Sequence, residues 1–211
     1  LAPSPSSELL DVDNNGKTYR VAWLEVNNPS AVSLIPNFAE HRTARSLIEN
    51  KVCRGVINGG FYTKDDQPTG LFTSEGKTLR DAIPNSLLNG FFLIDKDNRV
   101  AIDSSLPETP LRIGLQTGPI LIGNGKTANL AIHNDEFARR VIAATTNIEK
   151  IIFLIVYDPE NPWSGPRLAD TPDILSNVSS RLQIRNAINL DGGSASAFIR
   201  SDLSLQELTS V

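Results

Sequence analysis

The sequence predicts an α+β protein in which mixed, largely antiparallel β-sheets pack together and are flanked by a few helices. Three observations support this prediction. Short apolar segments rich in β-branched residues recur between clusters of Gly, Asn, Asp and Pro, two segments have apolar residues at helical spacing, and the sequence has no repeat of fixed period. With 40% hydrophobic residues among 211, the chain can bury one large core.

The predicted elements are short strands and two helices. The helices are expected over residues 39–50 and 174–182, where apolar side chains recur at helical spacing. Residues 87–94 and 100–102 flank the turn-forming segment DKDN and predict a hairpin. Residues 151–157 (IIFLIVY) are apolar on both faces, which is typical of a central strand. The other strands are expected at residues 19–26, 52–57, 111–115, 119–122 and 187–190.

The N-terminal residues differ in character from the rest of the chain. Residues 1–16 are polar, contain two prolines and end in the turn signal D-x-D-N-N-G, so we expect a loose arm there and a single domain over residues 17–211. Residue 1 is not Met, and the first residues are small and rich in Pro and Ser. This composition is common at the mature ends of exported proteins and favours a periplasmic or secreted protein.

Composition and charge exclude several classes of function. The net charge is -4 and Lys and Arg are scattered, so we expect no nucleic-acid partner. The longest apolar run, residues 151–157, is shorter than the roughly 20 residues that a membrane-spanning helix needs. The lone Cys53 forms no intramolecular disulfide and is expected in the core. With only His41 and His133 besides, the sequence supports no Cys/His zinc site, and we predict no metal or cofactor.

Two predicted strands end in the same pattern, a polar residue followed by two glycines. Glycine lets a ligand approach the backbone closely, so each pair can present N–H groups to an anion beside a polar side chain. A third segment places a Gly-Pro pair at a strand entrance, where the fixed φ of proline would stiffen a pocket wall. The residues concerned are Asn58, Gly59 and Gly60, then Asp191, Gly192 and Gly193, and then Gly118 with Pro119.

These segments resemble the phosphodiester glycosidase family, and the likeness runs nearly end to end. It comprises N-G-G-F-Y at residues 58–62, P-x-G-L at 68–71, T-G-P-I-L at 117–121 and N-A-I-N-L-D-G-G at 186–193, together with RVAWLEVNNP and NGFFLID. An arginine that precedes a strand in the family falls on Arg139, with Arg140 as the alternative register. The chain departs from the family at Ala143 and after D-G-G, where Ser194, Ala195 and Ser196 follow.

The resemblance implies a hydrolase that cleaves the bond between the anomeric carbon of a sugar, with N-acetylglucosamine as one candidate, and a phosphodiester. The products are the sugar and a phosphomonoester. The implied catalytic residues are Asp191, facing the anomeric centre or its attacking water, and Arg139, binding the phosphate. The implied substrate-binding residues are Asn58, Gly59, Gly60, Gly118, Arg140, Gly192, Gly193, Ser194 and Ser196.

Alternatives to this assignment remain open. Asp191 can instead cap the segment that follows it, and Arg139 can pair with Asp135 on the surface. Glu136 is a candidate second carboxylate, although its position favours a solvated surface residue. Because the chain departs from the family pattern at Ala143 and after D-G-G, two other functions are also considered. One is a non-catalytic module that binds a phosphosugar or exopolysaccharide in the same pocket, and the other is a glycosidase whose substrate lacks phosphate.

Overall fold

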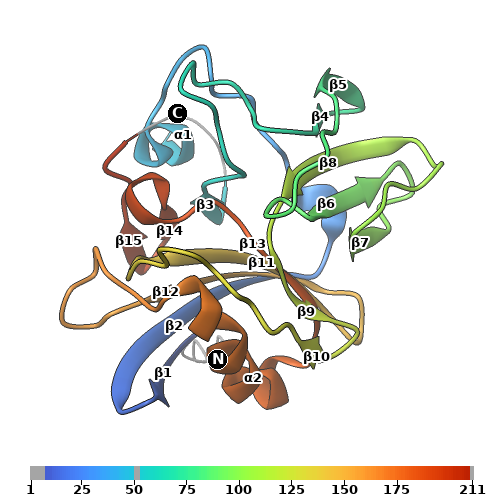
Figure 1. Cartoon of the computed structure of the whole chain (residues 1–211). Helices are drawn as coiled ribbons and strands as arrows, with labels where there is room; N and C mark the ends of the chain where they lie inside the picture. Colours follow the sequence, from blue (N-terminus) through green and yellow to red (C-terminus); the bar gives the residue numbers. More distant parts are fainter. Residues whose placement is uncertain (1–7, 50–52, 210–211) are drawn as a thin grey trace, which may run out of the picture.

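The computed structural model describes residues 8–49 and 53–209, which form three β-sheets and two α-helices (Figure 1). Every strand pairing in this part of the chain is antiparallel. The predicted α+β class with largely antiparallel sheets is therefore confirmed. Neither helix is long and apolar enough to cross a membrane.

The three sheets differ in size and draw their strands from distant parts of the chain. In spatial order, the seven-stranded sheet contains β1 (Leu9–Asn14), β2 (Lys17–Val26), β12 (Ile151–Tyr157), β11 (Arg140–Thr146), β13 (Ile184–Asn189), β9 (Ile120–Gly123) and β10 (Lys126–Thr127). The five-stranded sheet contains β5 (Lys77–Arg80), β4 (Phe72–Ser74), β8 (Leu111–Thr117), β6 (Gly90–Asp95) and β7 (Val100–Asp103). The three-stranded sheet contains β15 (Leu203–Leu205), β14 (Phe198–Arg200) and β3 (Gly55–Ile57).

The helical elements are short. The α-helices are α1 (Ala44–Glu49) and α2 (Thr171–Leu182), and the 3₁₀ turns are η1 (Pro29–Ala31), η2 (Leu168–Asp170) and η3 (Gly193–Ala195). In Figure 1, α2 lies on one side of the seven-stranded sheet, while the two smaller sheets lie on the other. Helix α1 packs against the three-stranded sheet through Ala44 and Ile48.

Alternating side chains of the central strand β12 supply two cores. Leu154 and Val156 belong to the apolar cluster that includes Ile174 of α2. Ile155 and Tyr157 belong to the cluster that the two smaller sheets cover. Because successive side chains of a strand point to opposite faces, a strand that is apolar at every position serves both clusters. The prediction that residues 151–157 form a central strand is confirmed, with β2 and β11 on either side.

The predicted N-terminal arm is wrong for residues 9–14. These residues form β1, which pairs with β2 from Leu9 opposite Ala22 to Asn14 opposite Lys17. The sequence does contain a strand pattern here, because the apolar Leu10 and Val12 alternate with acidic residues. Both side chains face the α2 side of the sheet. The first part of the arm, residues 1–7, lies outside the described residues.

Other elements also differ from the predicted boundaries. The predicted helix over residues 39–50 is shortened to α1, and the predicted strand at 52–57 begins at Gly55, with Asn50 and Val52 outside the described residues. Cys53 is exposed rather than buried. The apolar runs at 111–115 and 119–122 are strands β8 and β9, but they belong to different sheets. The hairpin of β6 and β7, the helix at 174–182 and the strand at 187–190 are confirmed in outline.

The two-sided core predicts the effect of a truncation in β12. Leu154 is fully buried, so Leu154→Ala should lower the free energy of unfolding by about 2–5 kcal/mol, through lost apolar burial and the remaining cavity. Ile148 is 62% exposed, and Ile148→Ala should change stability by less than about 0.5 kcal/mol. Urea denaturation of both variants measures the difference, and equal losses would contradict the assigned burial.

Candidate active site

The two Gly-Gly segments lie against each other, although 133 positions separate Asn58 from Asp191 in the sequence. The Asp191 N–H donates to the Gly59 carbonyl at 3.0 Å. The Asn58 amide nitrogen donates to the Asp191 carbonyl at 2.7 Å, and the Ala197 N–H donates to Asn58 Oδ1 at 2.9 Å. The Asn58 amide thus connects the end of β3 to the segment after β13. Both of its polar atoms are used by the protein itself.

A cavity of about 620 Å³ opens beside this junction. Four of the predicted site residues line it, namely Asn58, Gly59, Gly60 and Asp191. The other predicted site residues do not line it, and they are Gly118, Arg139, Arg140, Gly192, Gly193, Ser194 and Ser196. Of the predicted set, one carboxylate and one Gly-Gly pair therefore line the cavity, together with Asn58. Neither of the two predicted arginines lines it.

The Asp191 carboxyl has an unusual proton affinity. Its surroundings bury it, which disfavours the charged form and raises the pKa of Asp191 to about 6. The Gly192 N–H donates to Asp191 Oδ1 at 2.8 Å and opposes this shift in part. A carboxyl in a cavity that changes its protonation state near pH 6 is suited to proton transfer at neutral pH.

The two glycine pairs use their N–H groups differently. Among the described residues, the N–H groups of Gly59 and Gly60 have no hydrogen-bond partner, and both glycines line the cavity. The Gly192 N–H is taken by Asp191, and the Gly193 N–H donates to the Arg139 carbonyl at 3.1 Å. A Cβ on Gly192 would lie 2.8 Å from that same carbonyl, so glycine is needed there for close packing. Of the two pairs, only the first lines the cavity and has N–H groups without a partner in the described chain.

Arg139 lies behind the D-G-G segment and is 1% exposed. Its Nη2 donates to the Gln206 carbonyl at 2.8 Å, and its guanidinium stacks on the Trp163 ring at 4.6 Å. Burial lowers the pKa of Arg139, while the charge of Glu207 acts in the opposite direction. Arg139 Nε is buried and has no partner among the described residues. The side chain holds the segment before Glu207, which itself lines the cavity.

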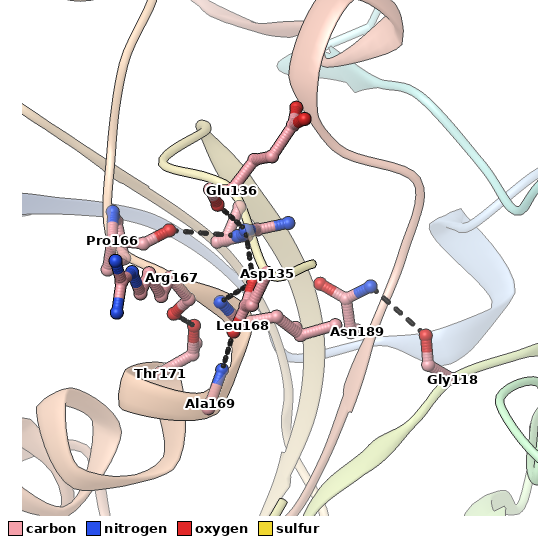
Figure 2. Close-up of polar contacts among 10 residues, drawn as sticks. Gly118, Asp135, Glu136, Pro166, Arg167, Leu168, Ala169, Thr171 and Asn189 are labelled. Atoms are coloured by element: carbon pink, nitrogen blue, oxygen red, sulfur yellow. Dashed lines mark hydrogen bonds and ion pairs between the residues drawn. The ribbon is translucent and has the colours of Figure 1, made fainter. Parts of the chain in front are cut away.

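Arg140 is held by a separate cluster of partners. Its Nε donates to the Pro166 carbonyl at 3.0 Å, and Nη2 lies 3.3 Å from Asp135 Oδ1. Asp135 also accepts from the N–H groups of Leu168 and Ala169 at 2.9 and 2.8 Å (Figure 2). Burial lowers the pKa of Arg140, and Asp135 opposes this. The expected ion pair with Asp135 therefore exists, but Arg140 rather than Arg139 makes it.

Glu136, the candidate second carboxylate, is exposed and does not line the cavity. Its backbone carbonyl accepts from Arg140 Nη2, whereas its carboxylate points away from Asp135 and Pro166 in Figure 2. The structure thus separates Glu136 from Asp191, and the side chain has the solvated position that its sequence context favoured.

The remaining predicted site residues stabilise the segments around the cavity. Ser196 is buried and donates from Oγ to the Gly193 carbonyl, and the exposed Ser194 accepts from Thr209 Oγ1 at 3.3 Å. Gly118 donates to the Asn189 carbonyl at 3.1 Å and accepts from Asn189 Nδ2 at 3.0 Å (Figure 2). A Cβ on Gly118 would clash with the Leu87 carbonyl. Its role is to let the chain pass from β8 into β9.

Sequence reasoning missed five charged residues that line the cavity, and they are Glu25, Arg42, Arg54, Asp66 and Glu207. Glu207 accepts the Ala44 N–H on Oε1 at 2.7 Å, and its Oε2 is buried without a partner among the described residues. The buried Arg42 Nε likewise has no partner in the described part of the chain. No local motif marks these residues, because segments distant in sequence bring them to the cavity. In the same part of the chain, no three His, Cys, Asp or Glu residues are grouped to hold a metal ion.

The family model of the phosphodiester glycosidases matches residues 51–208. The chain belongs to the phosphodiester glycosidase family. Members of this family are glycosidase-type hydrolases, and the present chain is therefore assigned to that class. No curated protein matches the sequence significantly.

Solved structures show that the fold is shared. The catalytic domain of zebrafish N-acetylglucosamine-1-phosphodiester alpha-N-acetylglucosaminidase, auto-inhibited by its pro-peptide, is similar with a TM-score of 0.72 and 20% identity, covering 96% of this chain and 76% of that one. A Synechocystis protein has a TM-score of 0.61 and 16% identity, covering 94% and 58%. A protein of Burkholderia pseudomallei K96243 has a TM-score of 0.60 and 11% identity, covering 89% and 70%. At these identities the likeness is one of family fold.

The Asn58 connection predicts a loss of stability when its amide is removed. Asn58→Ala leaves the Asp191 carbonyl and the Ala197 N–H without their partner, and should lower the free energy of unfolding by about 1–3 kcal/mol. Asn177 is exposed on α2, so Asn177→Ala is the matched control and should be near neutral. Urea denaturation measures both, and a neutral Asn58→Ala would rule out the proposed connection.

The raised pKa of Asp191 predicts a stability change that depends on pH. The folded state holds this proton more tightly than the unfolded chain, whose Asp pKa is near 3.8, so folding stability falls as the pH rises from about 4 to about 6. Asp191→Asn removes this penalty. Relative to wild type, the variant should gain about 1–3 kcal/mol between pH 4 and pH 7.5.

Urea denaturation at the two pH values measures this gain, and Asp97→Asn, at an exposed carboxyl, controls for the lost charge. A constant difference between Asp191→Asn and wild type at both pH values would show that Asp191 titrates normally.

Proposed function

We propose that this phosphodiester glycosidase hydrolyses the bond between the anomeric carbon of a sugar and a phosphodiester, releasing the sugar and a phosphomonoester. One observation carries the proposal. The Asp191 carboxyl and the unpartnered N–H groups of Gly59 and Gly60 line the same cavity. A carboxylate and fixed donors in one site match a transition state with positive charge on the sugar ring and negative charge on the departing phosphate.

In the proposed reaction, water adds to the anomeric carbon while the bond from that carbon to the phosphate oxygen breaks. Asp191 accepts the proton of the attacking water, which requires the carboxylate form and a pH above about 6. The phosphate leaves as a monoester, and the Gly59 and Gly60 N–H groups bind its negative charge. Phosphate is a good leaving group, so a separate general acid is less important than in ordinary glycosidases.

Arg139 was expected to bind the phosphate, but it does not line the cavity. We propose that arginines of the cavity wall bind the phosphate instead. Arg42 and Arg54 are the arginines that line the cavity in the described chain; Arg42 Nη2 pairs with Glu40 at 2.9 Å, and the buried Arg42 Nε lacks a partner there. A guanidinium binds two phosphate oxygens at once and stays charged. Arg139 and Arg140 then act as positioning residues that support the segments carrying Glu207 and Asp191.

Glu207 is the second carboxyl group that we propose for the site in place of Glu136. It lines the cavity with Asp191, and its buried Oε2 has no hydrogen-bond partner in the described chain. Two carboxyl groups flank the scissile bond in most glycosidases. The sugar itself is proposed only as a class, with N-acetylglucosamine among the candidates.

An assay of Asp191→Asn tests the chemistry. Wild-type protein is incubated with methyl diesters of glucose-, galactose-, mannose- and N-acetylglucosamine-1-phosphate, and the released sugar is measured. We expect one or more of them to be hydrolysed, with activity rising through about pH 6, and Asp191→Asn to lose about 10²-fold or more. Asp97→Asn should retain wild-type turnover.

The same assay separates the alternatives. Binding of a diester without release of sugar by the wild type would replace the enzyme with a phosphosugar-binding module. Hydrolysis of ordinary glycosides with no preference for the phosphodiesters would replace it with a glycosidase whose substrate lacks phosphate. One observation favours this last alternative. Neither Arg139 nor Arg140, the two arginines expected to bind the phosphate, lines the cavity.

A further inference from the structure

The cavity that contains Asp191 reaches well beyond the proposed reaction site. It extends between the seven-stranded and five-stranded sheets, because residues of β2, β12, β6 and β8 all line it. In this deeper part, several apolar side chains that pack on the core remain partly exposed. They are Leu24, Val26, Val32, Leu34, Phe38 and Phe153.

Phe153 shows where this exposure comes from. Its strand, β12, lies inside the sheet between β2 and β11, and Phe153 is the one residue of the seven in β12 that is not buried. The residues opposite it on the neighbouring strands, Leu24 and Ala143, also line the cavity. Across the gap between the sheets, the Phe92 ring lies 5.9 Å from the Phe153 ring. The side chain is therefore exposed to an internal space at the centre of the fold.

The size of the whole cavity, the proposed reaction site included, is typical of a binding pocket and exceeds that of a packing defect. Protein interiors leave few voids larger than a water molecule, whereas small-molecule pockets occupy roughly 300–1,000 Å³ and have mainly apolar walls. At about 620 Å³, the cavity falls in the range of pockets. An apolar wall does not suit a sugar, because its hydroxyl groups would lose water without gaining hydrogen bonds. The apolar side chains of the deeper part therefore suit an apolar ligand group.

We propose that the deeper part of the cavity binds the alkyl or isoprenoid chain of the alcohol that is esterified to the phosphate. The substrate class is then a sugar-1-phosphodiester of a lipid alcohol, and the second product is a lipid phosphomonoester. This inference rests on the proposed function for the position of the phosphate, beside Gly59, Gly60 and Asp191. The reaction is unchanged, since water adds at the anomeric carbon and the lipid stays on the phosphate.

Alkyl phosphates test the site without any turnover. Methyl, butyl, hexyl and octyl phosphate are titrated into the intact protein below their micellar concentrations, and the heat of binding is measured. Each added methylene should tighten binding about two- to fourfold, so that octyl phosphate binds about 10²-fold or more tightly than methyl phosphate, at one molecule per chain. Equal affinities for methyl and octyl phosphate would overturn the inference. The same result is expected if another segment of the chain occupies the space, and the inference would then also be wrong.

A pair of tryptophan variants locates the alkyl chain. Val32→Trp adds volume to the cavity wall and should weaken octyl phosphate by about tenfold or more while sparing methyl phosphate. Val100 is also partly buried against the same core but does not line the cavity, so Val100→Trp should spare both ligands. Equal weakening by the two variants would place the chain elsewhere and contradict the proposal. The chain-length series on the unmodified protein decides the matter if either variant fails to fold.

The outcomes separate this inference from the proposed function. A chain-length dependence without hydrolysis of any sugar phosphodiester would support the apolar site and remove the hydrolytic reaction. Hydrolysis of a methyl diester without any chain-length dependence would do the reverse. If both hold, the octyl diester of the accepted sugar phosphate should have a higher kcat/KM than the methyl diester.

Discussion

The hydrogen bonds of the Asn58 amide are the interaction on which the rest of the site depends. Asn58 follows a strand of the three-stranded sheet and Asp191 follows a strand of the seven-stranded sheet, and no local contact brings those two strand ends together. One side chain joins them by donating to the Asp191 carbonyl and accepting from the Ala197 N–H. The backbone bond from Asp191 to Gly59 completes the junction. The carboxyl of Asp191 is thereby held at the cavity, and within the described part of the chain only its Oδ1 accepts a hydrogen bond.

The same sequence pattern has opposite uses on the two sides of this junction. In the first pair, the N–H groups of Gly59 and Gly60 have no partner among the described residues, and both glycines line the cavity. In the second pair, Gly192 and Gly193 direct theirs to Asp191 and to the Arg139 carbonyl, so that the segment is fixed from within. A ligand site needs both kinds of glycine, because donors can be preorganised only if the neighbouring backbone is itself held in place.

The buried arginines illustrate how charge is used away from the cavity. Arg139 and Arg140 are adjacent in sequence at the start of β11 and extend to different partners, Gln206 and Trp163 for the first, Asp135 and Pro166 for the second. Guanidinium groups can be buried when backbone carbonyls, a carboxylate or an aromatic ring compensate the lost hydration. Their partners lie on segments that flank the D-G-G corner, so both arginines contribute to its position.

The sequence by itself determined the α+β class, the central strand β12 and the hairpin of β6 and β7, and it also predicted that the Asn58-Gly59 and Asp191 segments lie together. These features follow from local periodicity, turn residues and short motifs, which depend on neighbours in the chain. Tertiary structure alone decided that Leu10 and Val12 belong to a sheet strand, that Arg139 and Arg140 do not line the cavity, and that Glu207 and Arg42 do. Each of these outcomes depends on which distant segments become neighbours and on which hydrogen-bond partners each polar side chain then finds. Neither can be predicted from the spacing of residues in the sequence.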